Sequence, residues 1–173
     1  MKSTFQPYRR GIWRHDKRYD LDPASLSVEE FTAIARLSSV DAAKKRIPPI
    51  PPLQLLAISK SATTMPTAAK AKVSDVIKFL ISGLKHHGAG IPTLICMLAV
   101  ETKGAYPPMD RKFAAGLVAK NKVTAAEAKK LTGSNPATFA SVYVGKVLPA
   151  WRDSRKMLSA EAADNYWGSA GKA

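Results

Sequence analysis

The residue types that point most clearly to chemistry lie between positions 84 and 112. Gly88 and Gly90 come directly before the apolar run 91–100, and Asp110 stands in front of the next helical pattern. Glycines before a helix leave its first backbone N–H groups accessible, and such groups bind phosphate. A carboxylate at a helix start either caps the helix or stabilises a positive charge that develops nearby. The segment therefore predicts a phosphate-binding turn followed by a candidate catalytic acid, although such a turn often only joins two packed helices.

The charge of the chain indicates what kind of partner would bring phosphate to this turn. Its 173 residues contain 27 lysines and arginines against 13 aspartates and glutamates, which gives a formal net charge of +14. The isoelectric point is near 10.0. This balance favours a polyanion, and we expect nucleic acid; the alternatives are a membrane surface and a protein that its charge merely keeps soluble. Composition sets the partner class and leaves the reaction open.

Basic residues flank both the turn and the aspartate. Lys85 precedes the turn, whereas Arg111 and Lys112 follow Asp110. Cationic side chains and open backbone N–H groups are the groups that contact a phosphate backbone. The predicted DNA phosphate-binding residues are Lys85, Gly88, Ala89, Gly90, Arg111 and Lys112.

Hydrophobic periodicity predicts that helices position these residues. Apolar residues recur at helical spacing through most of the chain after residue 74, and no convincing alternating β-strand segment interrupts them. Ser74, Asp110, Thr124 and Asn135 stand where N-caps are expected. The run 91–100 is apolar on all sides, which is typical of a helix buried in the centre of an α-helical domain. The expected helices are 28–37, 74–84, 91–100, 111–120, 124–131, 135–147 and 160–167.

The first 52 residues differ in character from the rest of the chain. Residues 1–22 mix arginines with aromatic residues and lack periodicity, which predicts a basic arm that contacts a phosphate backbone or a protein partner. Four prolines within residues 47–52 predict an extended connector. Residues 60–72, rich in Ser, Thr, Ala and Lys, are expected to form a basic loop. We therefore divide the chain into 1–52 (arm, helix and connector) and 53–173 (helical domain), or a single compact unit overall.

Other classes of site are excluded by what the chain lacks. Cys96 is the single cysteine, so neither an intramolecular disulfide nor a cysteine-based zinc cluster can form. Two of the three histidines are adjacent, which does not suit a mononuclear metal site. We expect no metal and no cofactor. The longest apolar run is far shorter than the roughly 20 residues that cross a bilayer, and no signal-type apolar core follows the N-terminus. These features predict a cytoplasmic or nucleoid-associated protein without membrane contact.

The order of these features resembles the helix-hairpin-helix DNA glycosylase superfamily, particularly its 8-oxoguanine-glycosylase-like branch and small bacterial relatives. In that family a Leu-Pro-Gly-Val-Gly hairpin leads into an apolar helix, then a loop with aromatic or proline residues, then an aspartate at the next helix start. The matching segments here are His86-His87-Gly88-Ala89-Gly90, the helix from Pro92, and Tyr106-Pro107-Pro108-Met109-Asp110. The segment Ala163-Asp164-Asn165-Tyr166-Trp167-Gly168 resembles the C-terminal ending of the small relatives. The resemblance covers about residues 74–167.

The resemblance implies an all-α domain with a helix-hairpin-helix element and a catalytic role for Asp110. In the family this aspartate stabilises the oxocarbenium-like sugar, or activates the attacking water, as the N-glycosidic bond breaks. Bifunctional members carry a lysine nucleophile just after the hairpin, where this chain has Pro92, so the resemblance implies a monofunctional enzyme that leaves an abasic site. The flipped base would lie in a pocket to which Tyr106 and Trp167 are assigned. The alternative for both rings is a place in the core.

Three functions remain open from the sequence. The first is a DNA glycosylase that acts on a damaged or modified base with Asp110 as its carboxylate. The second is a non-catalytic DNA-binding relative of the same fold. The third is an interaction protein of a defence or counter-defence system, whose basic face binds an acidic protein. Only the first requires Asp110, and the third predicts no salt-dependent DNA binding.

Overall fold

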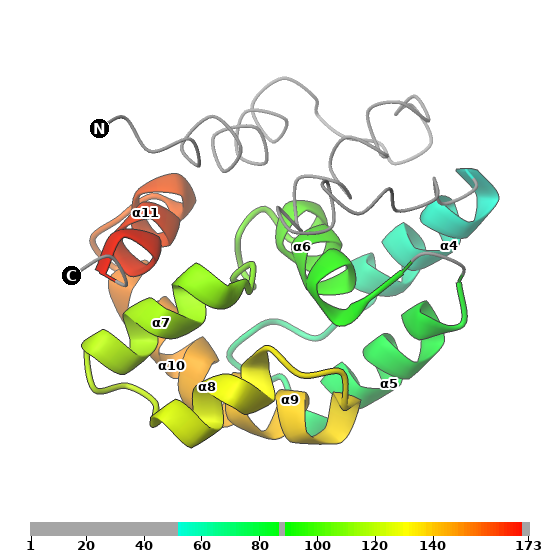
Figure 1. Cartoon of the computed structure of the whole chain (residues 1–173). Coiled ribbons are helices and arrows are strands. Elements are labelled where there is room, and N and C mark those ends of the chain that lie inside the picture. The colour runs from blue at the N-terminus through cyan, green and yellow to red at the C-terminus, as the bar shows by residue number, and fades with distance from the viewer. Residues whose placement is uncertain (1–51, 87–88, 171–173) are drawn as a thin grey trace.

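Helices account for the regular structure throughout the part of the chain that the computed structural model describes, residues 52–86 and 89–170. The expected all-α fold is confirmed for these residues, whereas the arm, the helix 28–37 and most of the connector lie outside them. Figure 1 shows how the helices surround α6. They are α4 (Pro52–Thr63), α5 (Val73–Leu84), α6 (Ile91–Glu101), α7 (Arg111–Ala119), α8 (Ala125–Leu131), α9 (Pro136–Val142), the π-helical segment η2 (Tyr143–Val147), α10 (Leu148–Ser154) and α11 (Ala160–Ala170).

Three of the four expected N-caps are confirmed. The Thr124 hydroxyl accepts from the N–H of Glu127 at 3.2 Å, and the Asn135 side chain accepts from two N–H groups at the start of α9. Asp110 caps α7. The expectation for Ser74 is wrong because α5 begins at Val73, and the Lys72 N–H donates to the Asp75 carboxylate at 2.8 Å instead. The Asp75 side chain thus bonds the backbone N–H of the N-cap residue, which is one half of a capping box.

The expected loop over residues 60–72 begins later than predicted. Helix α4 continues through Lys60 to Thr63, although this stretch is rich in Ser and Thr. Ile58 and Ala62 are fully buried, and α4 packs along α6. Burial of apolar side chains against a neighbouring helix outweighs a weak local preference for coil, so tertiary packing extends the helix.

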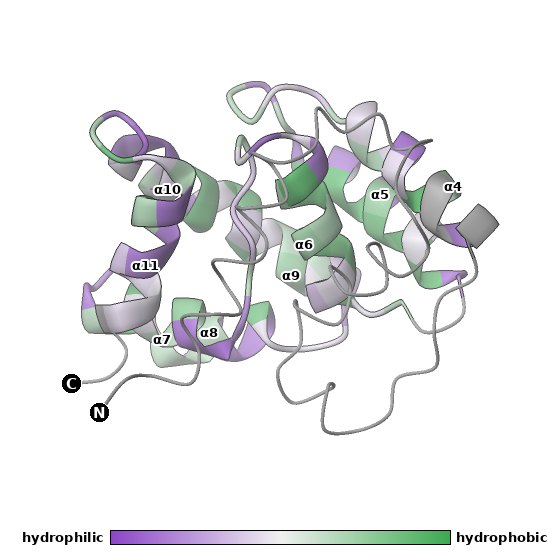
Figure 2. Ribbon diagram, turned by 90° about the horizontal axis from the view of Figure 1, so that it is seen from above, coloured by the Kyte–Doolittle hydropathy of each residue, from purple (hydrophilic) through white to green (hydrophobic). Residues whose placement is uncertain are grey.

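Helix α6 forms the centre of the core. Residues 93–100 are buried without exception, which confirms the helix that is apolar on all sides. In Figure 2 this helix is coloured mostly as hydrophobic, while α7, α8 and α11 carry hydrophilic stretches. Gly83 brings α5 close to α6, because a Cβ at this position would lie 2.4 Å from Leu94 Cδ2. The helices before and after the predicted hairpin, α5 and α6, are therefore packed tightly against each other.

The predicted helix 135–147 is longer in the structure and contains a π-helical turn. Helix α9 passes into η2 and then into α10, and the Leu148 N–H donates to the Tyr143 carbonyl five residues back. Pro149 has no N–H to donate to the Gly145 carbonyl, and its ring would clash with that carbonyl in a regular helix. The wider π turn relieves this conflict and lets the helix run on to Ser154.

Helices α7 and α11 pack closely at Gly116. A Cβ on Gly116 would fall 1.7 Å from the Trp167 carbonyl oxygen, so only glycine permits this approach. Phe113 and Trp167 lie in the same contact, with ring centroids 6.2 Å apart. This packing holds the helix that begins at Asp110 in a fixed direction. No helix in residues 52–86 or 89–170 is long and apolar enough to span a bilayer.

Candidate nucleic-acid interface

The predicted phosphate-binding turn lies between α5 and α6. Lys85 is the C-cap of α5 and is exposed, and the Ala89 N–H closes a turn onto the His86 carbonyl at 3.1 Å. Gly90 is the N-cap of α6 in an extended conformation, where a Cβ would meet only Pro92 Cδ at 3.7 Å. Neither its backbone angles nor its neighbours require glycine. Gly88 lies outside the described residues.

Pro92 limits what the start of α6 can offer to a phosphate. It occupies the second position of the helix, where its ring nitrogen has no hydrogen to donate. One of the N–H groups that a helix N-terminus normally presents is therefore missing. The phosphate-binding role of Lys85, Ala89 and Gly90 stays a prediction. Of these three residues, the exposed Lys85 would supply the positive charge.

Asp110 holds a fixed place at the start of α7. Its Oδ1 accepts the Phe113 N–H at 2.7 Å, and the residue is half-buried. The capping role weighed from the sequence is thus confirmed, and it is compatible with catalysis because one carboxylate can do both. Arg111 is exposed and Lys112 is half-buried directly behind it. The carboxylate and two cations therefore share the first turn of one helix.

The segment that leads into Asp110 is buried and tied down by two tyrosines. Tyr143 donates its hydroxyl to the Pro107 carbonyl at 2.6 Å, and the Tyr106 hydroxyl donates to the Pro66 carbonyl. Burial, with a smaller contribution from Asp75, raises the pKa of Tyr106 to about 12. Burial, and then the nearby Tyr106, raise the pKa of Tyr143 well above its usual value. Both hydroxyls stay protonated donors at neutral pH, so the loop before Asp110 is held rigidly.

The two rings assigned to a base pocket lie in the core. Tyr106 is 1% exposed and Trp167 is 3% exposed, so neither has an open face on which a base could stack. The Trp167 indole N–H donates to Ser154 Oγ at 3.1 Å, and Trp167 packs against Phe113. In the described structure the accessible ring on α11 is Tyr166, which is 44% exposed and lies 4.0 Å below the Lys120 ammonium.

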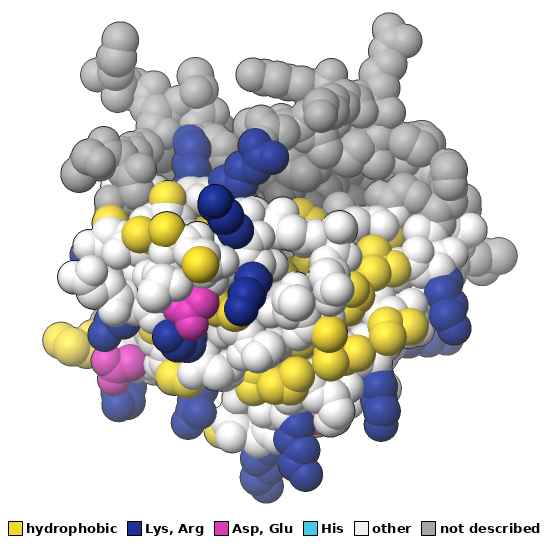
Figure 3. Space-filling view, turned by 60° about the horizontal axis from the view of Figure 1, so that its bottom comes forward, with side chains coloured by type: hydrophobic (Ala, Val, Ile, Leu, Met, Phe, Trp, Pro, Cys, Tyr) yellow, Lys and Arg dark blue, Asp and Glu magenta, His cyan; other side chains and the backbone are white. Residues whose placement is uncertain are grey.

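Cationic side chains are spread over the surface rather than confined to the predicted turn. Figure 3 shows lysine and arginine side chains around the rim of one face, with hydrophobic atoms between them and few acidic side chains. Some of this charge is paired: Lys146 lies 2.8 Å from Glu127, and Lys156 lies 3.0 Å from Asp153. The pKa of Glu127 is lowered by the hydrogen bond from Lys146 and then by the Thr124 N–H.

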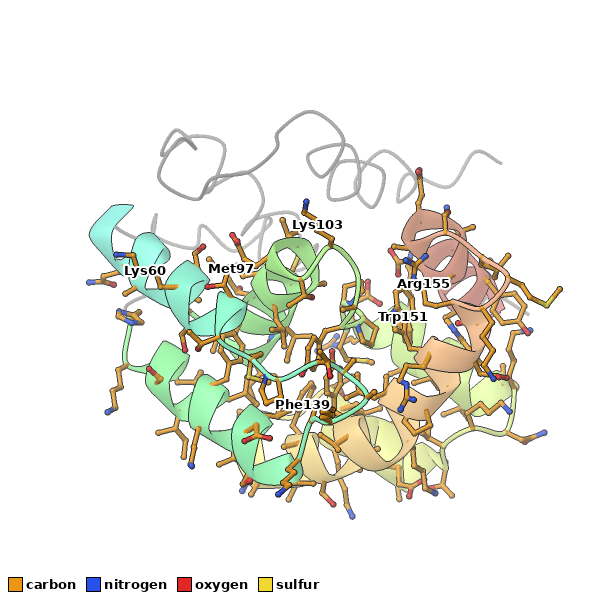
Figure 4. The ribbon with its side chains drawn as sticks, turned by 180° about the vertical axis from the view of Figure 1, so that it is seen from behind. Lys60, Met97, Lys103, Phe139, Trp151 and Arg155 are labelled. Atoms are coloured by element: carbon orange, nitrogen blue, oxygen red, sulfur yellow. The ribbon has the colours of Figure 1, made fainter. Side chains whose placement is uncertain are left out.

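Sequence reasoning missed a basic hollow at one end of the core helix. Its volume is about 410 Å³, and Lys103, Arg152, Arg155 and Lys156 bring positive charge to its wall. Figure 4 shows Lys103 at the end of α6. Trp151 lies in α10 and Arg155 at its C-terminal end. The remaining lining residues are Ala68, Thr102, Gly104, Ala105 and Trp151. We call this feature the basic hollow.

No signal in the sequence brings these residues together, because they come from three separate segments of the chain. Within the described ranges, no group of three histidine, cysteine or acidic residues is placed to hold a metal ion. Comparisons with protein-family models, with curated proteins and with solved structures find no match.

Proposed function

We propose that this protein binds DNA and hydrolyses the N-glycosidic bond of a damaged or modified base, with Asp110 as the catalytic carboxylate. The net charge of +14 supports the DNA part of the proposal. The observation that carries the catalytic part is the position of Asp110. Its carboxylate is fixed by a 2.7 Å bond to the Phe113 N–H, at the end of a loop that Tyr143 anchors.

A fixed carboxylate suits this reaction because positive charge develops on the sugar. The C1′–N bond breaks, and the base leaves with the bonding electrons and takes up a proton from solvent. A water oxygen then bonds to C1′, one of the protons of this water passes to the Asp110 carboxylate, and the carboxylic acid returns it to solvent. A preorganised negative charge stabilises such a transition state without reorganising at the moment of reaction. Pro92 stands where a lysine nucleophile would be required for strand cleavage, so the product is an abasic site.

The test replaces Asp110 with asparagine. Asparagine caps helices as well as aspartate does, and Asn135 already caps α9, so Asp110→Asn removes the charge and keeps the fold. We expect wild-type protein to release bases from a panel of damaged and modified DNA substrates. Asp110→Asn should lower the rate about 100-fold or more, as loss of a transition-state electrostatic contact does, while DNA affinity stays within a few-fold.

The matched control is Asp75→Asn. Asp75 is also an aspartate at the start of a helix that accepts a backbone N–H, from Lys72 at 2.8 Å. This variant should retain excision activity. Equal excision by wild type and Asp110→Asn would remove Asp110 from the mechanism.

A non-catalytic DNA-binding protein is the second candidate. The burial of Tyr106 and Trp167 favours it, because both rings proposed for a base pocket are occupied by core packing. This candidate predicts salt-dependent DNA binding by both wild type and Asp110→Asn, with no abasic product from any substrate. Absence of DNA binding at low salt would favour the third function, an interaction protein with an acidic protein partner.

A further inference from the structure

Several cationic side chains surround the basic hollow, whose volume suits a small ligand. Its volume of about 410 Å³ falls within the range of small-molecule sites. Lys103, Arg152, Arg155 and Lys156 line it, and no acidic residue does. We propose that the basic hollow is a phosphate-binding site, which seats a backbone phosphate of bound DNA. The phosphate chemistry follows from the hollow itself, whereas DNA as its source rests on the proposed function.

Lys103 occupies a position where a lysine is conformationally costly. It follows the C-cap of α6 with φ 51°, and the Lys103 and Gly104 N–H groups donate to Val100 and Ala99 at 3.0 and 2.8 Å. These two bonds define a Schellman motif, in which glycine is the usual residue at this position. The left-handed conformation is unfavourable for a non-glycine residue. The helix dipole favours a lysine near a helix C-terminus, but this offsets only part of that cost.

The same motif occurs at the end of α7 with an ordinary residue. Asn121 has φ 54°, and the Asn121 and Lys122 N–H groups donate to Val118 and Leu117 at 2.9 and 2.8 Å. Asparagine tolerates this conformation, so no functional reason is required there. At Lys103 the cost is not recovered by any ion pair or side-chain hydrogen bond with the residues that the structure describes. Lys103 is exposed and lines the hollow, so its ammonium can reach an anion there.

The walls of the basic hollow are held together rigidly. The Trp151 indole N–H donates to the Gly104 carbonyl at 2.9 Å, and this ring is 1% exposed. The bond joins α10 directly to the loop that carries Lys103. The Arg155 guanidinium donates to the Leu158 carbonyl at 2.8 Å, which fixes its direction and leaves it further N–H donors. Cations that are held in place lose less entropy when an anion binds.

The charges around the basic hollow lack strong internal partners. Arg152 is exposed and makes no ion pair within the described ranges. Lys156 contacts Asp153, but both side chains are about three-quarters exposed, and such surface pairs contribute little. Like charges around one hollow repel each other until an anion neutralises them. Phosphate oxygens suit this set because a guanidinium binds them in a bidentate manner and an ammonium adds a point charge.

The experiment compares two double variants of the full chain. Lys103→Gly with Arg152→Gln removes two cations of the basic hollow, and glycine suits the backbone at position 103. Asn121→Gly with Lys129→Gln is the control, because it makes the same backbone change in the second Schellman motif and removes an exposed lysine from α8, which does not line the hollow. DNA affinity is measured over a range of salt concentrations.

The slope of log Kd against log salt concentration reports how many phosphate contacts are made. We expect the Lys103→Gly/Arg152→Gln variant to lower the magnitude of this slope by about 0.9, the contribution of the one phosphate that the basic hollow would seat. The control variant should keep the wild-type slope. Wild-type DNA binding with equal slopes for all three proteins would overturn the phosphate site while leaving the proposed DNA binding intact.

A second measurement decides the case in which wild-type protein binds no DNA, where the proposed function itself fails. Inorganic phosphate and a nucleoside monophosphate are titrated separately while the indole N–H resonance of Trp151 is followed by NMR. A saturable shift in wild type that the Lys103→Gly/Arg152→Gln variant lacks would keep the phosphate site and assign it to a free phosphate compound. No shift with either compound would overturn the inference.

Discussion

The packing of α7 against α11 makes a sharp prediction for Gly116→Ala. The added methyl group would fall 1.7 Å from the Trp167 carbonyl oxygen, whereas ordinary contact begins at 3.4 Å. The obstacle is backbone, so no side-chain rotation relieves it. The two helices would have to separate by roughly 1.5 Å in an interior that packs as densely as a crystal.

The expected loss of stability follows from what this separation breaks. Overpacking of a core usually costs about 1–3 kcal/mol, and a rigid backbone neighbour puts this case at the upper end. The tilted ring contact between Phe113 and Trp167, at 6.2 Å between centroids, would also weaken. We therefore expect Gly116→Ala to lower the free energy of unfolding by about 3 kcal/mol. For a chain of this length that corresponds to a Tm lower by about 6–12 °C.

Urea unfolding, followed by tryptophan fluorescence and circular dichroism, measures the loss. The control is Gly145→Ala, because Gly145 is exposed in η2 and a Cβ there meets nothing within 4 Å. This variant should be more stable than wild type by up to about 1 kcal/mol, since alanine favours a helical backbone. The two alanine variants should thus differ in sign. If Gly116→Ala lost less than about 0.5 kcal/mol, the close approach of α7 and α11 would be refuted.

Two further variants test the loop before Asp110 and the ion pair on α8. Tyr143→Phe leaves the buried Pro107 carbonyl without its 2.6 Å bond, so it should lower the free energy of unfolding by about 1–3 kcal/mol in urea titrations and slow base excision. Glu127→Gln should be less stable than wild type at pH 7, and the difference should shrink as the pH falls below 4.5. The pKa of Glu127 is lowered in the folded chain by Lys146 and Thr124, so its contribution is fully present above the usual carboxylate pKa of 4.5 and is lost as the pH falls through the lowered pKa of the folded chain. Equal pH dependence of the two proteins would exclude that contribution.

Elements whose signals are local could be predicted from the sequence. The caps at Thr124 and Asn135 are read from side chains that bond N–H groups two or three residues away. The buried helix α6 follows from a run of apolar residues without a polar face. Asp110 combines both kinds of signal, a capping residue in front of an amphipathic pattern. In each case the information that fixes the structure lies within one continuous stretch of the sequence.

Features that depend on distant contacts could not be predicted in this way. Residues 60–63 are helical because Ile58 and Ala62 bury against α6, which outweighs the weak helix preference of Ser61 and Thr63. The π turn before Pro149 requires the helix to continue through a proline, which local rules treat as a stop. Trp167 belongs to a segment that resembles a family motif. In the structure its indole N–H donates to Ser154, and its ring packs against Phe113. Burial decided the role of this residue, and burial is a property of the assembled fold.

The basic hollow shows why a surface that binds a ligand can be impossible to predict from the sequence. Lys103 and Arg152 are about 50 residues apart in the chain, and each is one of many cations in the sequence. Trp151 brings them to one place, because its N–H reaches the Gly104 carbonyl at 2.9 Å. The single anomaly at this site, a lysine in a left-handed conformation, can be recognised only once φ is known. The glycine turn predicted phosphate binding at the start of the core helix α6. If phosphate binds in the basic hollow, this contact with DNA lies instead at the opposite, C-terminal end of α6.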